Sequence, residues 1–93
     1  MESKIYQITG QVQGVGFRYT ASQLARQLGI KGQVANMADG SVQLVVQASP
    51  DLIDELLTSL KAPKHNTAIN IDQIDLVATK NMPVFKDFSI YRP

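Results

Sequence analysis

The stretch Gly10-Gln11-Val12-Gln13-Gly14-Val15-Gly16-Phe17-Arg18 is predicted to contain the end of a strand, a turn and the start of a helix. Apolar and polar residues alternate before Gly14, which is typical of a strand, and from Phe17 onward the apolar residues follow helical spacing. Gly14 and Gly16 relax the turn, so that successive backbone N–H groups can point to one side. A helix N-terminus adds free donors and partial positive charge, and Arg18 adds a planar cationic fork. This stretch is therefore predicted to bind an oxyanion the size of phosphate.

Working outward from this stretch, caps and turns divide the rest of the chain. Gly29 is a C-terminal helix stop, Ser49 followed by Pro50 opens a second helix, and Asp39-Gly40 favours a hairpin. A bulge is expected near Asp72-Gln73 in the fourth strand. The expected elements are a strand over residues 4–13, a helix from Phe17 to Gly29, strands over 32–36 and 42–48, a helix from Pro50 to Lys61, a strand containing residues 69–77 and a last strand around 85–91.

This order of elements predicts an α+β fold, a ferredoxin-like two-layer sandwich. Both helices are expected on one face of a mostly antiparallel sheet of about five strands. A right-handed crossover between the first and second strands leaves room for the third strand between them. The first two strands then run parallel, and their C-terminal ends share one rim. Arg18, after the first strand, is therefore expected to lie alongside Asn36, at the end of the second.

Length and composition limit the class of protein. A chain of 93 residues fits one domain over residues 1–93, and 44% hydrophobic with 18% charged residues is an ordinary globular composition without a membrane span. The chain has no cysteine, which excludes disulfides, thiolate zinc sites and a cysteine nucleophile. A net charge of +1 provides no broad field for a nucleic acid. We expect a cytoplasmic monomer.

In two separated motifs the chain resembles the acylphosphatase family. The first motif is the stretch from Gly10 to Arg18, and the second is Gly32-Gln33-Val34-Ala35-Asn36-Met37-Ala38-Asp39-Gly40-Ser41-Val42. Between them, Ala25, Leu28 and Gly29 also have the family's spacing. The resemblance extends over nearly the whole chain.

The resemblance implies a metal-independent hydrolase without a cofactor, which cleaves the carboxyl-phosphate bond of small acyl phosphates. Its products would be a carboxylate and inorganic phosphate, the latter also an inhibitor. Arg18 matches the family's phosphate-binding arginine, and Asn36 matches the catalytic asparagine that holds the attacking water. The family's phosphate cradle corresponds to the backbone amides of Gln13, Gly14, Val15, Gly16, Phe17 and Arg18.

Two residues depart from the family's pattern. Gln33 stands where an aromatic residue is frequent, and Ala35 where a basic one is frequent. The first departure affects local packing, and the second affects anion attraction at the periphery or substrate preference. Neither residue belongs to the assigned chemistry.

Several of these sequence features also have a purely structural interpretation. A glycine turn is often only a turn, and Asp39-Gly40 is assigned to hairpin geometry. His65 is expected in a solvated loop. Tyr6 and the phenylalanines could form a base-stacking surface, but exposed aromatic pairs with basic companions are missing, so core packing is favoured. The competing functional class is a non-catalytic phosphate-binding or regulatory ferredoxin-like module.

Overall fold

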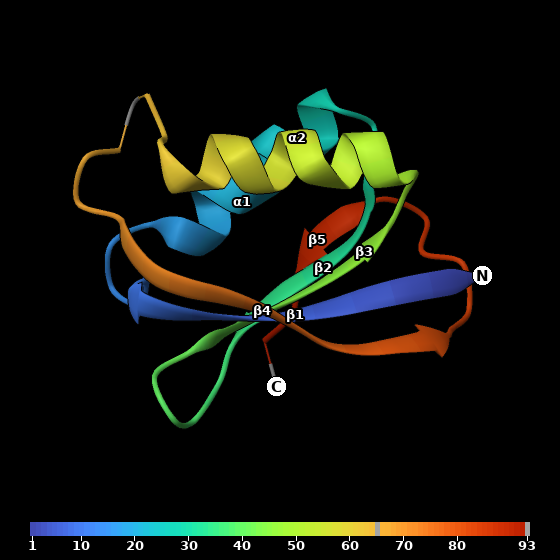
Figure 1. Ribbon diagram of the computed structural model, residues 1–93, viewed down its shortest axis with the longest axis horizontal. Coiled ribbons are helices and arrows are strands. Elements are labelled where there is room, and N and C mark those ends of the chain that lie inside the picture. The colour runs from blue at the N-terminus through green and yellow to red at the C-terminus, as the bar shows by residue number, and fades with distance from the viewer. Residues whose placement is uncertain (65, 93) are drawn as a thin grey trace.

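The computed structural model describes residues 1–64 and 66–92, so the prediction for His65 lies outside the described residues. Figure 1 shows the helices and strands in space. Their bounds are β1 Glu2–Gln11, α1 Phe17–Gln27, β2 Lys31–Asn36, β3 Val42–Gln47, α2 Pro50–Lys61, β4 Asn70–Asn81 and β5 Phe88–Ile90. The predicted order of elements is confirmed, including both helix starts.

The strands form one sheet in the order β4-β1-β3-β2-β5. Because β1 and β2 are both antiparallel to β3, which lies between them, they run parallel to each other as predicted. The two helices cover one face of this sheet, which makes the predicted α+β two-layer sandwich (Figure 1). The ends of β1 and β2 therefore lie on the same side of the molecule.

The strand pairing gives the positions of the last two strands, whose order in the sheet could not be predicted from the sequence. β4 pairs antiparallel with β1, and β5 pairs parallel with β2 at the opposite edge. The pairing of β1 with β4 skips one residue between Gln73 and Ile71, which confirms the predicted bulge there. A second skip lies opposite Ile5 and Tyr6 and was not predicted.

The prediction of a last strand around residues 85–91 was wrong at its start. The Phe85 N–H donates to Oε1 of Gln47 (3.0 Å), and Nε2 of Gln47 donates to the Pro83 carbonyl (2.9 Å). Gln47 is 3% exposed, so a buried side chain holds this segment in place of a strand partner. The other strand bounds also shifted, because β1 pairs with β4 from Glu2 to Gln11 and β4 follows it to Asn81.

The core lies between the helices and the sheet. Phe17 and Phe88 are each 1% exposed and belong to the core cluster with Tyr6, which confirms core packing for these two phenylalanines. Core packing was wrong for Phe85, which is only partly buried and lies outside that cluster. Ser49 caps α2 by accepting a hydrogen bond from the Leu52 N–H (3.4 Å), as its place before Pro50 predicted. The fully buried core includes Ile8, Val12, Ala21, Ala25, Val34, Val42, Leu44, Leu56 and Leu60.

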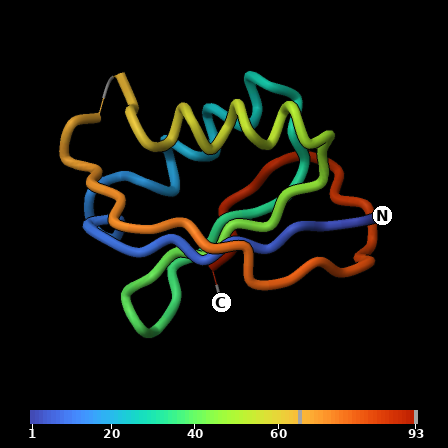
Figure 2. The backbone as a smooth tube through the Cα atoms, in the orientation of Figure 1, coloured from blue at the N-terminus to red at the C-terminus, as the bar shows by residue number. Residues whose placement is uncertain are grey.

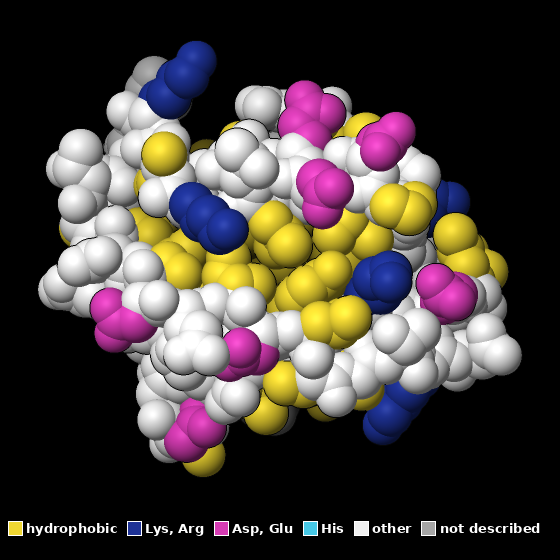
Figure 3. All heavy atoms as spheres, in the orientation of Figure 1, with side chains coloured by type: hydrophobic (Ala, Val, Ile, Leu, Met, Phe, Trp, Pro, Cys, Tyr) yellow, Lys and Arg dark blue, Asp and Glu magenta, His cyan; other side chains and the backbone are white. Residues whose placement is uncertain are grey.

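Hydrophobic side chains also reach the surface between α2 and the sheet, where Figure 3 shows them as a band. Ile71 and Ile74 of β4 are partly buried against the core, and Leu76 is 50% exposed. Within the described residues, neither helix has the length and apolar character needed to cross a bilayer.

Candidate active site

The loop between β1 and α1 has the backbone that the glycines predicted. Gly14 (φ +75°) and Gly16 (φ +78°) are both left-handed, a conformation that costs residues with a Cβ about 1–2 kcal/mol. Gly16 is the N-cap of α1, with no side-chain cap. The first hydrogen bond of the helix runs from the Thr20 N–H to the Gly16 carbonyl (3.1 Å). Among the described residues, none accepts a hydrogen bond from the amides of Gly14 to Arg18.

Gln13 ties this loop to the turn between β2 and β3. Its Nε2 donates to the Met37 carbonyl (2.9 Å) and to the Ser41 carbonyl (2.8 Å). The two segments that carry the family resemblance are therefore joined directly, although they are remote in sequence. Only the backbone amide of Gln13 was predicted to take part in the site, because a glutamine after a strand has no distinctive pattern that reveals its side-chain contacts.

Asp39 organises the other end of that connection. One carboxylate oxygen accepts hydrogen bonds from the Ser41 Oγ (2.6 Å) and the Ser41 N–H (2.9 Å). The other oxygen accepts one from Nε2 of Gln7 (3.3 Å). The hydrogen bonds from Ser41, the side-chain bond first, lower the pKa of the Asp39 carboxyl below its usual value. These contacts agree with the assignment of Asp39 to the hairpin.

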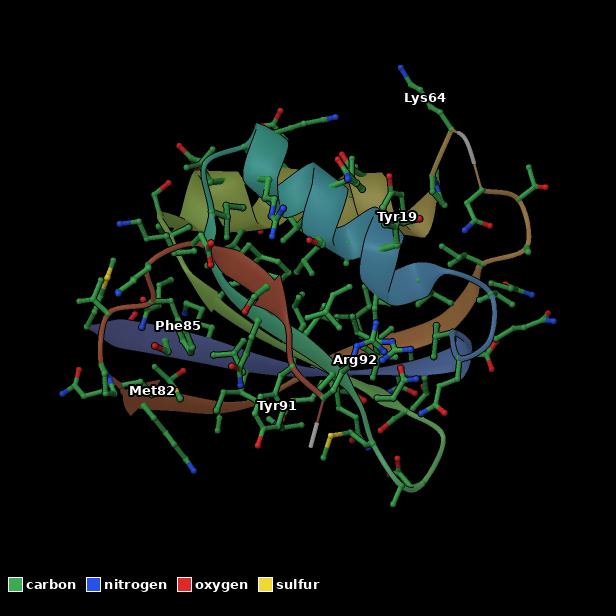
Figure 4. The ribbon with its side chains drawn as sticks, turned by 180° about the vertical axis from the view of Figure 1, so that it is seen from behind. Tyr19, Lys64, Met82, Phe85, Tyr91 and Arg92 are labelled. Atoms are coloured by element: carbon green, nitrogen blue, oxygen red, sulfur yellow. The ribbon has the colours of Figure 1, made fainter. Side chains whose placement is uncertain are left out.

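A hollow of about 210 Å³ lies where the loop, the first turn of α1 and the end of β5 meet. Ligand pockets for larger molecules span about 300–1,000 Å³, so this hollow suits a phosphoryl group better than a bulky cofactor. It includes Arg18 and also Arg92, which Figure 4 shows beyond the end of β5. The lining residues are Val12, Gly14, Gly16, Phe17, Arg18, Tyr19, Ile90 and Arg92. Sequence reasoning did not identify Arg92, because nothing local connects it with the loop.

Asn36 lies at the end of β2 on the helix-covered face of the sheet. Side chains two apart on a strand share a face, and Val34 belongs to the core on that face. The register places Asn36 opposite Val42, which in turn pairs with Ile8 of β1. Its Oδ1 is buried and has no hydrogen-bond partner among the described residues. A buried polar atom without a partner is costly and marks a place where function can outweigh stability.

Arg18 and Asn36 thus lie on one rim of the molecule but not in one hollow. Asn36 is absent from the lining around Arg18. The parallel pairing of β5 with β2 joins Ile90 to Val34 and continues with a bond from the Tyr91 N–H to the Val34 carbonyl (2.9 Å). Followed two residues beyond Ile90, this register brings Arg92 level with Asn36. The end of β5 therefore lies next to the end of β2, which carries Asn36, and also lines the hollow.

The two departures from the family's pattern lie away from this site. Gln33 and Ala35 alternate with Val34 and Asn36 along β2, so they face the opposite side of the sheet. Ala35 is 5% exposed, and Gln33 is partly buried. Neither is positioned to contact an anion held by the loop.

The site is rich in hydrogen-bond donors and poor in groups that titrate. It offers backbone amides, the Arg18 guanidinium and one carboxamide, which suit the binding of an oxyanion and the orientation of a neutral molecule. Within residues 1–64 and 66–92, no three His, Asp or Glu side chains come together as a metal-binding group.

A larger hollow, of about 630 Å³, adjoins the loop on its other side. It lies between α1 and the segment that follows α2, and it includes Gly16, Tyr19 and Lys64. Figure 4 shows Tyr19 at the start of α1 and Lys64 on the segment beyond α2. This hollow was not predicted from the sequence, because it joins two remote segments of the chain.

Comparison with known proteins gives a consistent result. The acylphosphatase family profile matches residues 4–90. An acylphosphatase of Lactobacillus johnsonii is 38% identical over 90 residues, covering 97% of this chain and 98% of that protein. One of Ligilactobacillus salivarius is 41% identical over 83 residues, covering 89% and 90%.

Solved structures show the same similarity. An acylphosphatase from Bacillus subtilis shares the fold, with a TM-score of 0.87, 24% identity, and coverage of 99% of this chain and 100% of that one. A segment that makes up 12% of full-length HypF matches 98% of this chain, with a TM-score of 0.85 and 26% identity.

Proposed function

The chain belongs to the acylphosphatase family and hydrolyses acyl phosphates, and we propose that the loop from Gln13 to Arg18 binds the phosphoryl group while Asn36 orients the attacking water. The observation that supports this most strongly is the loop itself. Its left-handed glycines and its helix start without a side-chain cap leave a run of backbone N–H groups that have no acceptor within residues 1–64 and 66–92, beside the Arg18 side chain. An anion with several oxygens is the ligand that such donors match.

The proposed chemistry needs little from the protein beyond positioning and charge stabilisation. The leaving group is a carboxylate whose conjugate acid has a pKa of about 4, so it departs without being protonated. Phosphoryl transfer passes through a loose transition state with its charge spread over the equatorial oxygens. Fixed amides and the Arg18 guanidinium are suited to stabilise that charge, because they are already oriented before the reaction begins.

Asn36 orients the water and does not act as a base. Its carboxamide is neutral, but it offers both an acceptor oxygen and two donor hydrogens with which to hold a water in line with phosphorus. Among the described residues its Oδ1 has no hydrogen-bond partner, so the fold itself does not use this acceptor. The proton of the water leaves through a phosphate oxygen of the substrate. No general base or metal is needed in this scheme.

Isotope labelling tests the proposed attack at phosphorus. Hydrolysis of an acyl phosphate in H₂¹⁸O is expected to place the label in inorganic phosphate. Label in the carboxylate would mean attack at carbon and would overturn the role given to Asn36. Benzoyl phosphate, followed by its absorbance with and without a chelator, is expected to disappear at the same rate in both, with inorganic phosphate as a competitive inhibitor.

We further propose that residues 1–93 act as a single domain, as a monomer in the cytoplasm. The absence of cysteine and the near balance of charge support this. The alternative proposal, a non-catalytic phosphate-binding module, is disfavoured by the acylphosphatases that match nearly the whole chain. That proposal predicts that phosphate binds but that benzoyl phosphate is not turned over.

A further inference from the structure

Asn66 connects the segment after α2 to the β1–α1 loop. Its Nδ2 donates to the Val15 carbonyl (2.7 Å) and lies 3.4 Å from Oγ1 of Thr20, while its Oδ1 accepts from the Ala68 N–H (3.2 Å). Figures 1 and 2 show the two segments side by side, although they are far apart along the chain. The short bond to Val15 therefore fixes part of the loop from outside it.

The orientation of this carboxamide follows from its partners. The Val15 carbonyl can only accept, and the Ala68 N–H can only donate. The NH₂ group must therefore face Val15 and the oxygen must face Ala68. Reversing the amide would lose both bonds.

Holding the Val15 carbonyl also aims the next amide. In a trans peptide the C=O and the following N–H point in opposite directions. The Val15 carbonyl is turned toward Asn66, so the Gly16 N–H points away from it. In the same way, the Gly16 carbonyl is held by the Thr20 N–H, so the Phe17 N–H points outward from the helix start. The two peptide planes on either side of Gly16 are thus fixed by separate contacts.

We propose that Asn66 is a positioning residue that keeps the Gly16 N–H aimed at the bound phosphoryl group, an inference that rests on the phosphate-binding role given to the loop. A peptide next to glycine turns easily, because glycine tolerates most backbone angles. If the Val15–Gly16 plane turned over, it would present a carbonyl oxygen to an anion in place of a donor. Nδ2 of Asn66 lies only 3.2 Å from where a Cβ on Gly16 would stand, so the carboxamide packs closely against this glycine.

The test uses two variants of Asn66 and one control. Asn66→Ala removes the donor without adding charge. Asn66→Asp keeps the shape and the acceptor for Ala68, but sets a carboxylate oxygen against the Val15 carbonyl. Thr67→Asp adds the same charge at the neighbouring exposed position, whose side chain makes no hydrogen bond to the described part of the loop. Titration with inorganic phosphate is followed through the ¹H–¹⁵N signals of the loop, at a temperature where each variant is folded by circular dichroism.

Asn66→Ala is expected to raise the phosphate Kd about threefold to tenfold, the cost of one hydrogen bond, and to reduce the phosphate-induced shift of the Gly16 amide. Asn66→Asp is expected to weaken binding further, and more than Thr67→Asp does. A residue that served only stability would lower the Tm but leave both the Kd and the Gly16 shift unchanged.

Different results would contradict the phosphate-binding role of the loop and the positioning role of Asn66. If phosphate does not shift the amides from Gly14 to Arg18 in the unmodified protein, the phosphate-binding role of the loop is wrong. If it does shift them, and Asn66→Ala keeps the same Kd and the same Gly16 response, the loop binds phosphate but Asn66 does not position it. If Asn66→Asp and Thr67→Asp raised the phosphate Kd equally, the added negative charge alone would explain the loss of binding. That result would also overturn the positioning role of Asn66.

Discussion

Replacing Arg18 with lysine separates the shape of this side chain from its charge. Arg18 is partly buried in the first turn of α1 and lines the small hollow beside the loop. A guanidinium can donate two parallel hydrogen bonds to a phosphoryl group, whereas an ammonium acts as a point charge. Arg18→Lys therefore keeps the charge and loses the fork.

The size of the expected effect follows from the bond that is lost. A hydrogen bond to a charged group contributes about 1.5–3 kcal/mol, so losing one from the transition state should lower kcat/KM about 10-fold to 150-fold. Arg18→Ala loses the charge as well and should cost about 3 kcal/mol or more, at least about 150-fold. Lysine is therefore expected to fall between arginine and alanine.

Arg26→Lys is the matched control on the same helix. Arg26 lies eight residues further along α1, about 12 Å at 1.5 Å per residue, and its Nε donates to the Phe88 carbonyl (2.9 Å). This variant loses a structural hydrogen bond, so the free energy of unfolding should fall by about 1 kcal/mol while kcat/KM stays unchanged. Hydrolysis of benzoyl phosphate and urea denaturation measure the two quantities.

The reasoning is refuted if Arg18→Lys hydrolyses benzoyl phosphate as well as the unmodified protein does. It is also refuted if Arg18→Lys and Arg26→Lys lose activity equally, since the effect would then follow stability. A loss of activity in Arg18→Lys with an unchanged free energy of unfolding is the result expected.

Three further predictions concern other parts of the chain. Asn36→Ala should lower kcat about 100-fold, because the water is no longer held in line, and should leave the Kd for phosphate nearly unchanged; normal turnover would exclude this role. Gly32→Ala should lower the free energy of unfolding, measured in urea, by about 3 kcal/mol, because the added Cβ would overlap the Val45 carbonyl. Gly40→Ala adds a Cβ in open space and should lower it by only about 1 kcal/mol. Equal losses in the two variants would contradict this explanation. The pKa of the Asp39 carboxyl is lowered in the folded state, so its contribution to stability is present above the unfolded pKa of about 4 and is lost as the pH falls through the folded pKa. The urea midpoints of Asp39→Asn and of the unmodified protein should therefore converge in acid. A difference in midpoint that stays constant with pH would exclude this contribution.

Local signals predicted the helices and most of the sheet because their physical causes are local. Ser49 caps the start of α2 with Pro50 at its first position, and Gly29, with φ +72°, ends α1 as a left-handed residue just beyond the helix. The parallel arrangement of β1 and β2 followed from the handedness of the crossover. The same rule placed Arg18 and Asn36 on one rim.

What the sequence could not predict depends on contacts between remote segments. The last strand was expected from Phe85, but the Gln47 side chain takes the Phe85 N–H, and no local pattern announces a buried glutamine with that role. Arg92 reaches the hollow only because β5 pairs with β2. Asn66 contacts Val15 although the two residues are 51 positions apart and both helices lie between them in the sequence. In each case the spatial partner is set by topology and not by spacing.

A crystal structure with bound phosphate or sulfate tests the central claim most directly. The account predicts one ion within hydrogen-bond distance of the backbone amides between Gly14 and Arg18 and of the Arg18 guanidinium, with the Asn36 carboxamide directed toward a water on the ion. An ion bound elsewhere, with the loop amides and Arg18 free of it, would contradict the account.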